Sequence, residues 1–524
     1  MTASSGIRVQ APSTLPASRC RVEFARASMT GPTGRITDDA LDCDSRSDLE
    51  ARSAPAHPRA RRPRRRSPHV SATLAPPQPT STKEQRRIAF ATVIGTTIEW
   101  YDFFIYANAS GLVFAAAFFA PAGDSLATLV AFASVGISFL FRPLGAFLAG
   151  HFGDRLGRRT MLVLTLGLMG IATTLIGLLP TYAQIGIAAP ILLLLLRILQ
   201  GVSAGGEWGG AVLMAVEHAP AAKRGRFGAF PQIGVPIGML LASAVLALMA
   251  GVFAPGEAFL EWGWRVPFLF SIVLLFVGMW VRRSVDESPV FTALAERKQR
   301  SNVPIAKLFR FHALLVILAA LTFAGNNAAG YMTTGGFLQR YATDPEGPHA
   351  LPITPVLLAV SVAAVVWLAT TWFGGVVSDR IGRRTTYIIG WVVQLATVFP
   401  MFFLVDTGEI LWFTVGISLF TIGNGLTYGP QAAFFSELFP ASIRYSGIAI
   451  SYAIGAIIGG AFAPMIAQAI VQATGSVISI GWYMVAITVV AFIATLLIRD
   501  RTGIDLGPDN EEEQARNPIY GARG

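Results

Sequence analysis

The amino-acid sequence predicts an all-α membrane protein with twelve transmembrane helices in two six-helix pseudo-repeats, and three observations support this fold class. Hydrophobic residues make up 53% of the chain and charged residues only 14%, whereas soluble domains are about 25% charged. Apolar stretches of about 20 residues, long enough to cross a bilayer, recur along the chain. The heptapeptide GDRLGRR at 153–159 returns as SDRIGRR at 378–384, which indicates an internal repeat.

Residues 1–85 differ in composition from the rest of the chain. They are rich in Pro, Ser, Ala and Arg and lack apolar periodicity, so we expect a disordered, basic tail in the cytoplasm. The tail could bind anionic lipid headgroups, regulate the protein or be a gene-model artefact. No apolar segment follows its arginines before the first span, which argues against a cleaved secretory signal. Both cysteines, Cys20 and Cys43, lie in the tail, so thiol chemistry is not expected in the membrane body.

The apolar stretches predict twelve spans in two bundles of similar length. The N-terminal bundle covers residues 86–283 and the C-terminal bundle covers 312–500, with a polar cytoplasmic linker at 284–311 and a cytoplasmic tail at 501–524. The predicted spans are 89–118, 126–150, 161–180, 187–215, 228–252, 262–281, 312–339, 353–377, 386–404, 410–436, 446–470 and 478–498.

Lysine and arginine lie mainly in the even-numbered loops between the predicted spans. Loops rich in these residues stay in the cytoplasm, so both termini are predicted to be cytoplasmic. The loop asymmetry and the basic tail also explain the net charge of +10, and nucleic-acid binding is therefore not expected. We expect a monomer in the cytoplasmic membrane of a bacterial cell.

The repeated loops combine residues with distinct physical roles. Their glycines permit a tight turn, their arginines hold the loop in the cytoplasm, and their aspartates can cap a helix or pair with an arginine of the other half. A second pattern, Glu-x2-Pro-x3-Arg, begins at Glu217 and again at Glu437. Two unrelated patterns that recur at nearly the same spacing support the duplication.

Ionisable residues inside spans are costly in hydrocarbon and usually face a cavity or a partner. All of them lie in the first half: Glu99, Asp102, Arg142, Arg197 and Glu207. Arg142 precedes the loop residue Asp154 by twelve positions, about 18 Å along a helix, which places it near the bilayer centre. A guanidinium there can hold a carboxylate; the alternative is an internal ion pair with Glu99 or Asp102.

The spacing between the two heptapeptides matches these charges with neutral groups in the second half. Asp102 corresponds to Asn327, Tyr106 to Tyr331 and Arg142 to Trp367. Asn424, Tyr428 and Gln431 share one helix face, where interhelical hydrogen bonding is the alternative to ligand contact. The predicted substrate-binding residues are Arg142, Tyr106, Arg197, Gln200, Asn327, Tyr331, Trp367, Asn424, Tyr428 and Gln431.

Asp102, Glu99 and Glu207 are the predicted proton-coupling residues. Asp102 and Glu99 are three residues apart and are expected on the same helix face. A carboxylate in a partly desolvated site can take up a proton when the cavity opens to one side and release it on the other.

The paired loops resemble the signature loops of the major facilitator superfamily, between helices 2 and 3 and between helices 8 and 9. Further motifs resemble its metabolite:H+ symporter family: EWYDF at 99–103, RPLG at 142–145, RILQG at 197–201, GGE at 205–207, WGWRVP at 262–267 and DESP at 286–289. The resemblance covers about residues 86–500. It implies proton symport of a small carboxylated metabolite, since the family carries proline, betaine, α-ketoglutarate, citrate, shikimate and aromatic acids.

The resemblance also implies that the loop charges latch the cytoplasmic side when the protein is open to the outside. The alternative is that these charges only set the topology. The implied gating residues are Asp154, Arg155, Arg158, Glu217, Arg224, Asp379, Arg380, Arg383, Glu437 and Arg444.

We therefore predict a secondary active transporter that imports a small organic acid or zwitterion with a proton by alternating access. The alternatives are a uniporter or exporter of the same fold and a nutrient sensor that does not transport. The spans contain no grouping of nucleophile and base or of metal ligands, so neither an enzyme nor a cofactor or metal is expected. The expected partners are the substrate, the proton and the lipid bilayer.

Overall fold

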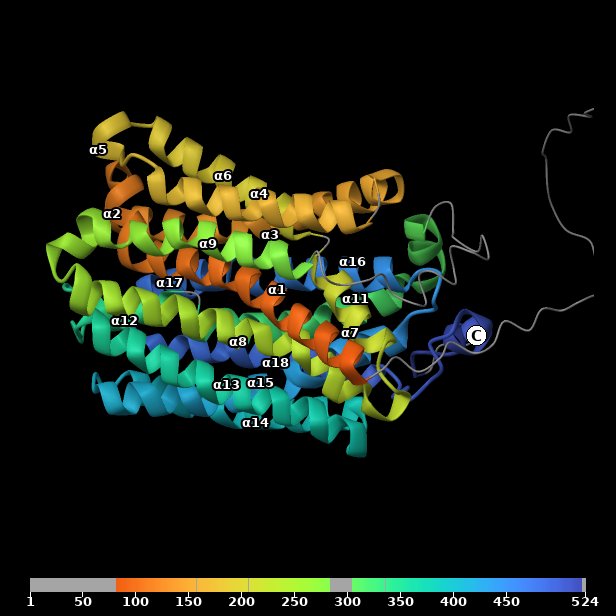
Figure 1. Cartoon of the computed structure of the whole chain (residues 1–524). Helices are drawn as coiled ribbons and strands as arrows, with labels where there is room; N and C mark the ends of the chain where they lie inside the picture. The colour runs from red at the N-terminus through yellow and green to blue at the C-terminus, as the bar shows by residue number, and fades with distance from the viewer. Residues whose placement is uncertain (1–81, 157, 206, 283–303, 335, 521–524) are drawn as a thin grey trace, which may run out of the picture. The chain divides into compact units, whose positions relative to one another are not determined.

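The computed structural model describes residues 82–156, 158–205, 207–282, 304–334 and 336–520. All of these residues lie in one compact unit, 74–524. The long helices of this unit run side by side along one direction (Figure 1). Nearly all of the predicted N-terminal tail and most of the predicted linker lie outside the described residues.

The first half of the unit is built from helices joined by short connections. In order they are α1 (Thr82–Ala109), η1 (Ser110–Phe114), α2 (Ala115–Phe118), η2 (Ala120–Ala122), α3 (Asp124–Leu156), α4 (Arg158–Leu178), α5 (Tyr182–Ile185), α6 (Ala188–Ala204), α7 (Glu207–Glu217), η3 (Ala221–Lys223), α8 (Arg224–Leu248), η4 (Met249–Phe253), η5 (Phe259–Gly263) and α9 (Arg265–Arg282).

The second half repeats this arrangement and adds a C-terminal segment. Its elements are α11 (Pro304–Thr334), α12 (Phe337–Thr343), α13 (Ile353–Ile381), α14 (Arg383–Val405), α15 (Ile410–Leu438), α16 (Arg444–Ala456), η6 (Ile457–Ala461), α17 (Ala463–Thr474), η7 (Val477–Ser479), α18 (Ile480–Leu497), η8 (Pro508–Asn510) and α19 (Glu511–Ala515).

The predicted all-α fold with twelve spans is confirmed. Within the described residues, eleven helices are long and apolar enough to cross a membrane. α4 supplies the twelfth through its apolar segment Val163–Leu178, which matches the third predicted span. Some spans join several elements, as where α6 continues into α7 and α16 continues through η6 into α17.

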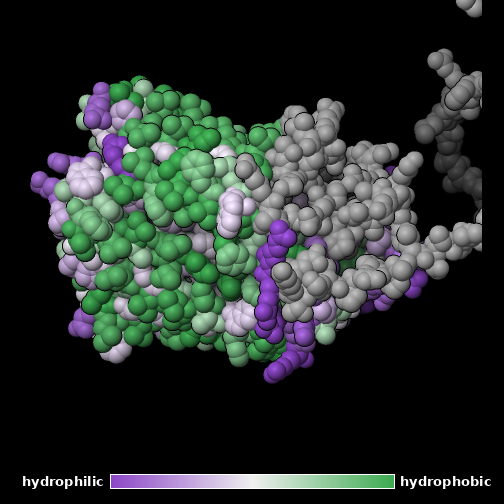
Figure 2. Space-filling view, in the orientation of Figure 1, coloured by the Kyte–Doolittle hydropathy of each residue, from purple (hydrophilic) through white to green (hydrophobic). Residues whose placement is uncertain are grey.

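The outer surface of the unit is apolar, as a lipid-facing surface must be. Figure 2 shows a broad hydrophobic band on one face, with hydrophilic residues gathered toward its two ends. Large apolar side chains point outward on the unit; Trp280 is 75% exposed and Phe276 is 64% exposed. Apolar exposure on this scale marks a surface that contacts something other than water.

The two halves contact each other along their central helices and near both ends. α8 packs along α13 and α15, and α3 packs against α16, η6 and α17. The end that carries the two repeated heptapeptides is called the motif end below, and the other is called the opposite end.

Toward the opposite end the halves meet through backbone at two glycines. A Cβ on Gly111, in η1, would lie 2.5 Å from the carbonyl oxygen of Gly336, which precedes α12. Gly336 has a φ of +86°, and a Cβ there would lie 2.2 Å from the carbonyl oxygen of Ala107. Glycine is the residue that permits both this approach and this backbone conformation.

In the part of the chain that the structure describes, four spans contain a π-helical turn: η1, η4, η5 and η6. A π turn accommodates one extra residue and locally widens the helix. The apolar pattern of the sequence does not predict these turns, because an extra residue in a continuous apolar run leaves the composition of the run unchanged.

Candidate functional site

A small cavity of about 10 Å³, roughly the space of one water molecule, lies between the halves. In the first half, α1 contributes Trp100 and Phe104 and α8 contributes Val235. Aromatic walls with a few polar groups are typical of small-molecule sites. The lining residues from the second half are Asn326, Asn327, Gly330, Tyr331, Trp367 and Tyr428, so four of the predicted substrate residues lie together here.

Arg142 is a buried cation beside this cavity. It is 2% exposed, and its guanidinium carbon lies 4.5 Å from the ring centre of Phe103 and 4.4 Å from that of Phe139. The Phe139 ring contacts the cavity residue Tyr331, with ring centres 5.3 Å apart. Three aromatic rings therefore place the arginine next to the cavity wall.

Among the described residues, no acidic side chain lies within ion-pair distance of the Arg142 guanidinium. Within the described residues, its Nε and Nη2 atoms have no hydrogen-bond partner, and it forms no ion pair. The internal pair with Glu99 or Asp102 that the sequence left open is not formed. A buried cation is costly unless it is paired and hydrogen-bonded, so this group is suited to binding an anion.

Polar side chains of the second half surround the same space. A Cβ on Gly330 would lie 3.6 Å from Asn424 Nδ2 and 3.6 Å from the Trp367 ring. Over the described ranges, hydrogen-bond partners are lacking for the side-chain amide of Asn424, the Tyr331 hydroxyl and the Trp367 indole N–H. The buried side-chain amide of Gln431 also lacks partners there, but Gln431 does not line the cavity. Buried polar groups are normally satisfied, so this concentration of unsatisfied groups indicates a site for a polar ligand.

Asp102 points away from the cavity, toward α4 and α9. It is 1% exposed, and it accepts hydrogen bonds from Ser271 at 2.7 Å and from Thr173 at 2.9 Å. In the part of the chain that the structure describes, no cation lies within ion-pair distance of Asp102. Its neighbours come from positions 169 and 71 residues away, and no sequence pattern indicated them.

Glu99 has different surroundings, although the spacing predicted that it would share a helix face with Asp102. Glu99 lies within electrostatic range of three tyrosines around the cavity, namely Tyr331, Tyr428 and Tyr452. Glu207, the third predicted coupling residue, interacts electrostatically with Asp102. Glu99 therefore lies near the cavity, whereas Glu207 lies near Asp102.

A chain of hydrogen bonds connects Asp102 to Arg197. Arg197 Nη1 donates to Gln200 Oε1 at 2.8 Å, and Gln200 Nε2 donates to Thr173 Oγ1 at 2.7 Å. Thr173 then donates to Asp102, but its hydroxyl also lies 2.9 Å from the carbonyl oxygen of Met169. One hydroxyl proton thus has two acceptors, and the chain links α1, α4 and α6.

Arg197 differs from Arg142 because its donors are occupied. Its Nη2 donates to the Val135 carbonyl and to Ser138 Oγ, both at 2.8 Å. Its guanidinium carbon lies 3.8 Å from the ring centre of Tyr106, whose hydroxyl is 2.7 Å from Ser134 Oγ. The predicted substrate residues Tyr106, Arg197 and Gln200 thus belong to an internal network and do not line the cavity.

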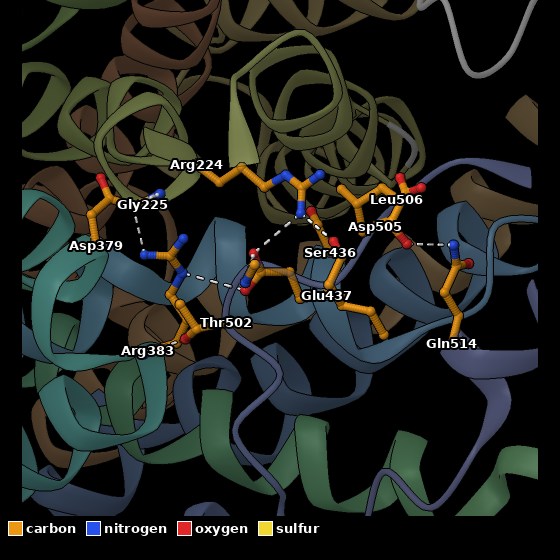
Figure 3. A network of polar contacts seen from close by, with 12 residues as sticks. Arg224, Gly225, Asp379, Arg383, Ser436, Glu437, Thr502, Asp505, Leu506 and Gln514 are labelled. Atoms are coloured by element: carbon orange, nitrogen blue, oxygen red, sulfur yellow. Dashed lines mark hydrogen bonds and ion pairs between the residues drawn. The ribbon is translucent and has the colours of Figure 1, made fainter. Parts of the chain in front are cut away.

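Charged residues of the two halves meet at the motif end (Figure 3). Arg224, at the start of α8, lies 3.5 Å from Glu437 of α15. Glu437 also accepts from Arg383 at 3.3 Å, and Arg383 in turn lies 2.7 Å from Asp379. Asp379 accepts hydrogen bonds from the backbone N–H groups of Gly225 and Arg226, so it caps a helix of the other half.

A second pair between the halves joins Arg444 of α16 to Glu217 of α7, 3.1 Å apart. The structure therefore brings six of the predicted gating residues together: Glu217, Arg224, Asp379, Arg383, Glu437 and Arg444. Arg380 is exposed and forms no ion pair in the described ranges. The side chains of Asp154, Arg155 and Arg158 lie outside the described residues.

Known proteins resemble this chain in sequence and in fold. A family model described as the Major Facilitator Superfamily matches residues 92–457. The chain is 39% identical over 429 residues to the inner membrane metabolite transport protein YhjE of Escherichia coli strain K12, covering 80% of this chain and 96% of that protein. It is 37% identical over 426 residues to the shikimate transporter of the same strain, again covering 80% and 96%.

A solved structure with a similar fold is the proton:xylose symporter XylE bound to 6-bromo-6-deoxy-D-glucose. The TM-score is 0.65 at 17% identity, over 83% of this chain and 99% of that chain. Similarity at this level of identity shows a common fold.

Proposed function

The chain belongs to the major facilitator superfamily, in its metabolite:H+ symporter family, and on that premise we propose that this transporter imports a small carboxylated metabolite with a proton by alternating access. The observation that carries the proposal is the buried guanidinium of Arg142, whose Nε and Nη2 atoms have no hydrogen-bond partner in the described residues. A carboxylate can accept from two guanidinium nitrogens at once. The aromatic rings around Arg142 exclude water, which strengthens that attraction.

The substrate class we propose is an organic acid, with a zwitterion as the second candidate. Shikimate, named for one relative, is a carboxylate. The zwitterion is favoured by Glu99, which lies within electrostatic range of the cavity tyrosines Tyr331 and Tyr428. A cation and an acidic group near one cavity could hold the two charges of an amino acid or betaine. Asn327, Tyr331, Trp367, Asn424, Tyr428 and Gln431 would contact the uncharged part.

We assign proton coupling to Asp102. Its partners are the hydroxyls of Ser271 and Thr173, and a hydroxyl can donate to an ionised carboxylate or accept from a protonated one. An arginine partner could only donate and would hold the ionised form. The Thr173 hydroxyl can also turn to the Met169 carbonyl, 2.9 Å away. Both protonation states of Asp102 can therefore be satisfied without moving a helix.

The motif end gives the transporter its orientation, and the two bundles are its moving parts. We propose that the motif end faces the cytoplasm of a bacterial cell, because its loops carry the excess of arginine, and that the protein works as a monomer. The moving bodies are the bundles 86–283 and 312–500. The pairs Arg224–Glu437 and Arg444–Glu217 would break when the motif end opens and re-form when it closes.

The experiment that tests the proposal is a substrate panel in reconstituted vesicles, with and without an imposed pH gradient. The panel contains organic acids, zwitterions and neutral sugars of similar size. We expect an organic acid to accumulate when the outside is acidic, and only to equilibrate when the gradient is collapsed. Accumulation of a neutral sugar in place of the acids would refute the substrate class, and accumulation without a pH gradient would refute proton coupling.

A further inference from the structure

The C-terminal segment, residues 499–520, folds back onto the motif end after α18. Ile498 and Ile519 form an antiparallel bridge, and Arg499 N donates to the Pro518 carbonyl at 2.9 Å. The guanidinium of Arg501 closes the loop by donating to the carbonyls of Glu513, Gln514 and Arg516. These contacts give the segment a defined shape of its own.

Gln514 anchors this segment to the gate. It is 1% exposed, and its Oε1 accepts from Ala441 N at 2.8 Å and from Arg444 Nη2 at 3.0 Å. Its Nε2 donates to the carbonyls of Asp505 at 2.7 Å and Gly507 at 2.8 Å. All four hydrogen-bonding positions of the amide are therefore used.

The segment also contacts the charges that join the two halves, as Figure 3 shows for Glu437, Arg224 and their neighbours. Arg444 Nη1 donates both to Glu217 and to the Leu506 carbonyl, each at 3.1 Å. Gly503 N donates to Glu437 Oε1 at 3.2 Å. Arg224, from the first half, donates to the Ile504 carbonyl.

We infer that residues 499–520 are a third component of the gate, alongside the two halves, and that Gln514 is a positioning residue for Arg444. Backbone carbonyls of the segment accept hydrogen bonds from Arg224 and Arg444 in addition to those that Glu437 and Glu217 accept. These extra bonds hold the two arginines in the geometry that pairs them across the halves. Because the contact of Ile504 with Arg224 crosses between the halves, it must break when the motif end opens. The segment thus stabilises the state in which this end is closed.

This inference does not depend on the substrate or on proton coupling, and its test needs neither. The two native cysteines are Cys20 and Cys43, so a C20S/C43S parent contains no cysteine. Ser436→Cys places an isosteric thiol at a fully buried position next to Glu437. The rate at which a hydrophilic maleimide labels this thiol, in purified protein in nanodiscs, reports how often the motif end is open.

In that parent we expect Gln514→Ala to raise the labelling rate about tenfold, since a lost hydrogen bond to a buried charged group shifts an equilibrium by about that factor. The matched control is Glu512→Ala, two residues away on an exposed side chain of the same helix, which should leave the rate unchanged. A substrate-free assay of this kind also separates the inference from any failure of the proposed transport function.

If Gln514→Ala does not fold, Gln514→Met provides the same test. It keeps the length of the side chain but can neither accept from Arg444 and Ala441 nor donate to the carbonyls of Asp505 and Gly507, so labelling should again be faster than in the parent. A folded Gln514→Ala or Gln514→Met protein that labels at the parent rate would overturn the inference. The segment would then be a passive stabiliser of the second half.

Discussion

Arg224 reaches Glu437 across the two halves of the chain at 3.5 Å, and their counterparts in the repeat, Arg444 and Glu217, make the reciprocal contact at 3.1 Å. One duplicated pattern thus produces two ion pairs related by the internal repeat. Each half contributes one arginine and one glutamate, so neither pair can persist if the halves separate at this end. The surroundings of the two pairs differ, however, and the difference can be tested.

Exchanging the two charges of the Glu217–Arg444 pair should not restore the function of that pair. Arg444 also donates to the Phe439 and Leu506 carbonyls, and a glutamate at this position could donate to neither. We expect Glu217→Arg with Arg444→Glu to transport as poorly as either single variant, and to unfold at a lower temperature because buried carbonyls lose their donors. Uptake rates and thermal unfolding in detergent check this; recovery of wild-type uptake would show that charge pairing alone is required.

Asp379→Asn should slow transport much more than it weakens substrate binding. Both carboxylate oxygens of Asp379 accept from backbone N–H groups at the start of α8, and an amide has one oxygen to offer. Asp379 lies at the motif end and does not line the cavity, so it biases the conformational equilibrium and leaves the ligand contacts intact. Calorimetry and uptake separate the two effects, with Arg380→Gln as the exposed neighbouring control. A parallel loss of affinity and turnover would count against this role.

Substitution by methionine should raise the stability of the protein at Arg142 and lower it at Arg197. Arg142→Met removes a buried cation that has no ion-pair partner among the described residues, and should raise stability by about 1 kcal/mol or more while binding of a carboxylated substrate is lost. Arg197→Met leaves the acceptors Gln200, Ser138 and the Val135 carbonyl without their donor, and should cost about 3 kcal/mol. Thermal unfolding measures both; a loss of stability in Arg142→Met would return this residue to a structural role.

Thr173→Val should uncouple substrate movement from the proton. The variant keeps the shape of the side chain but removes the hydroxyl between Asp102 and Gln200. We expect downhill exchange to continue and accumulation driven by a pH gradient to fall at least tenfold, with Thr173→Ser restoring it. Thr174→Val is the matched control, because Thr174 makes the same bond to the carbonyl four residues earlier without touching Asp102.

In this experiment the pH dependence distinguishes a coupling role from a packing role. A packing defect would reduce exchange and accumulation together, at every pH. Accumulation that survives in Thr173→Val with an unchanged pH profile would place proton coupling away from Asp102.

The duplicated Glu-x2-Pro-x3-Arg pattern matched Arg224 with Arg444 and Glu217 with Glu437, whereas the gating role of these residues was implied by the family resemblance. The cavity residues Asn327, Tyr331 and Trp367 followed from the same duplication. The hydroxyl partners of Asp102 did not, since Ser271 and Thr173 are ordinary residues in apolar helices and acquire their roles only through packing. The contacts of the C-terminal segment could not be predicted from the sequence for another reason. Backbone carbonyls make many of these contacts, and every residue has a backbone carbonyl whatever its side chain.

The contact between Gly111 and Gly336 makes the two ends of the protein unlike in the forces that close them. At the motif end the closing contacts include ion pairs, and dissolved electrolyte weakens ion pairs to the extent that ions reach them. At the opposite end the two halves meet through the backbone at Gly111 and Gly336 and through the rings of Phe132 and Phe337, by short-range attraction that electrolyte does not screen. Raising ionic strength therefore acts on one closure and leaves the other as it was. Ionic strength thus has a physical route to the balance between the two closures.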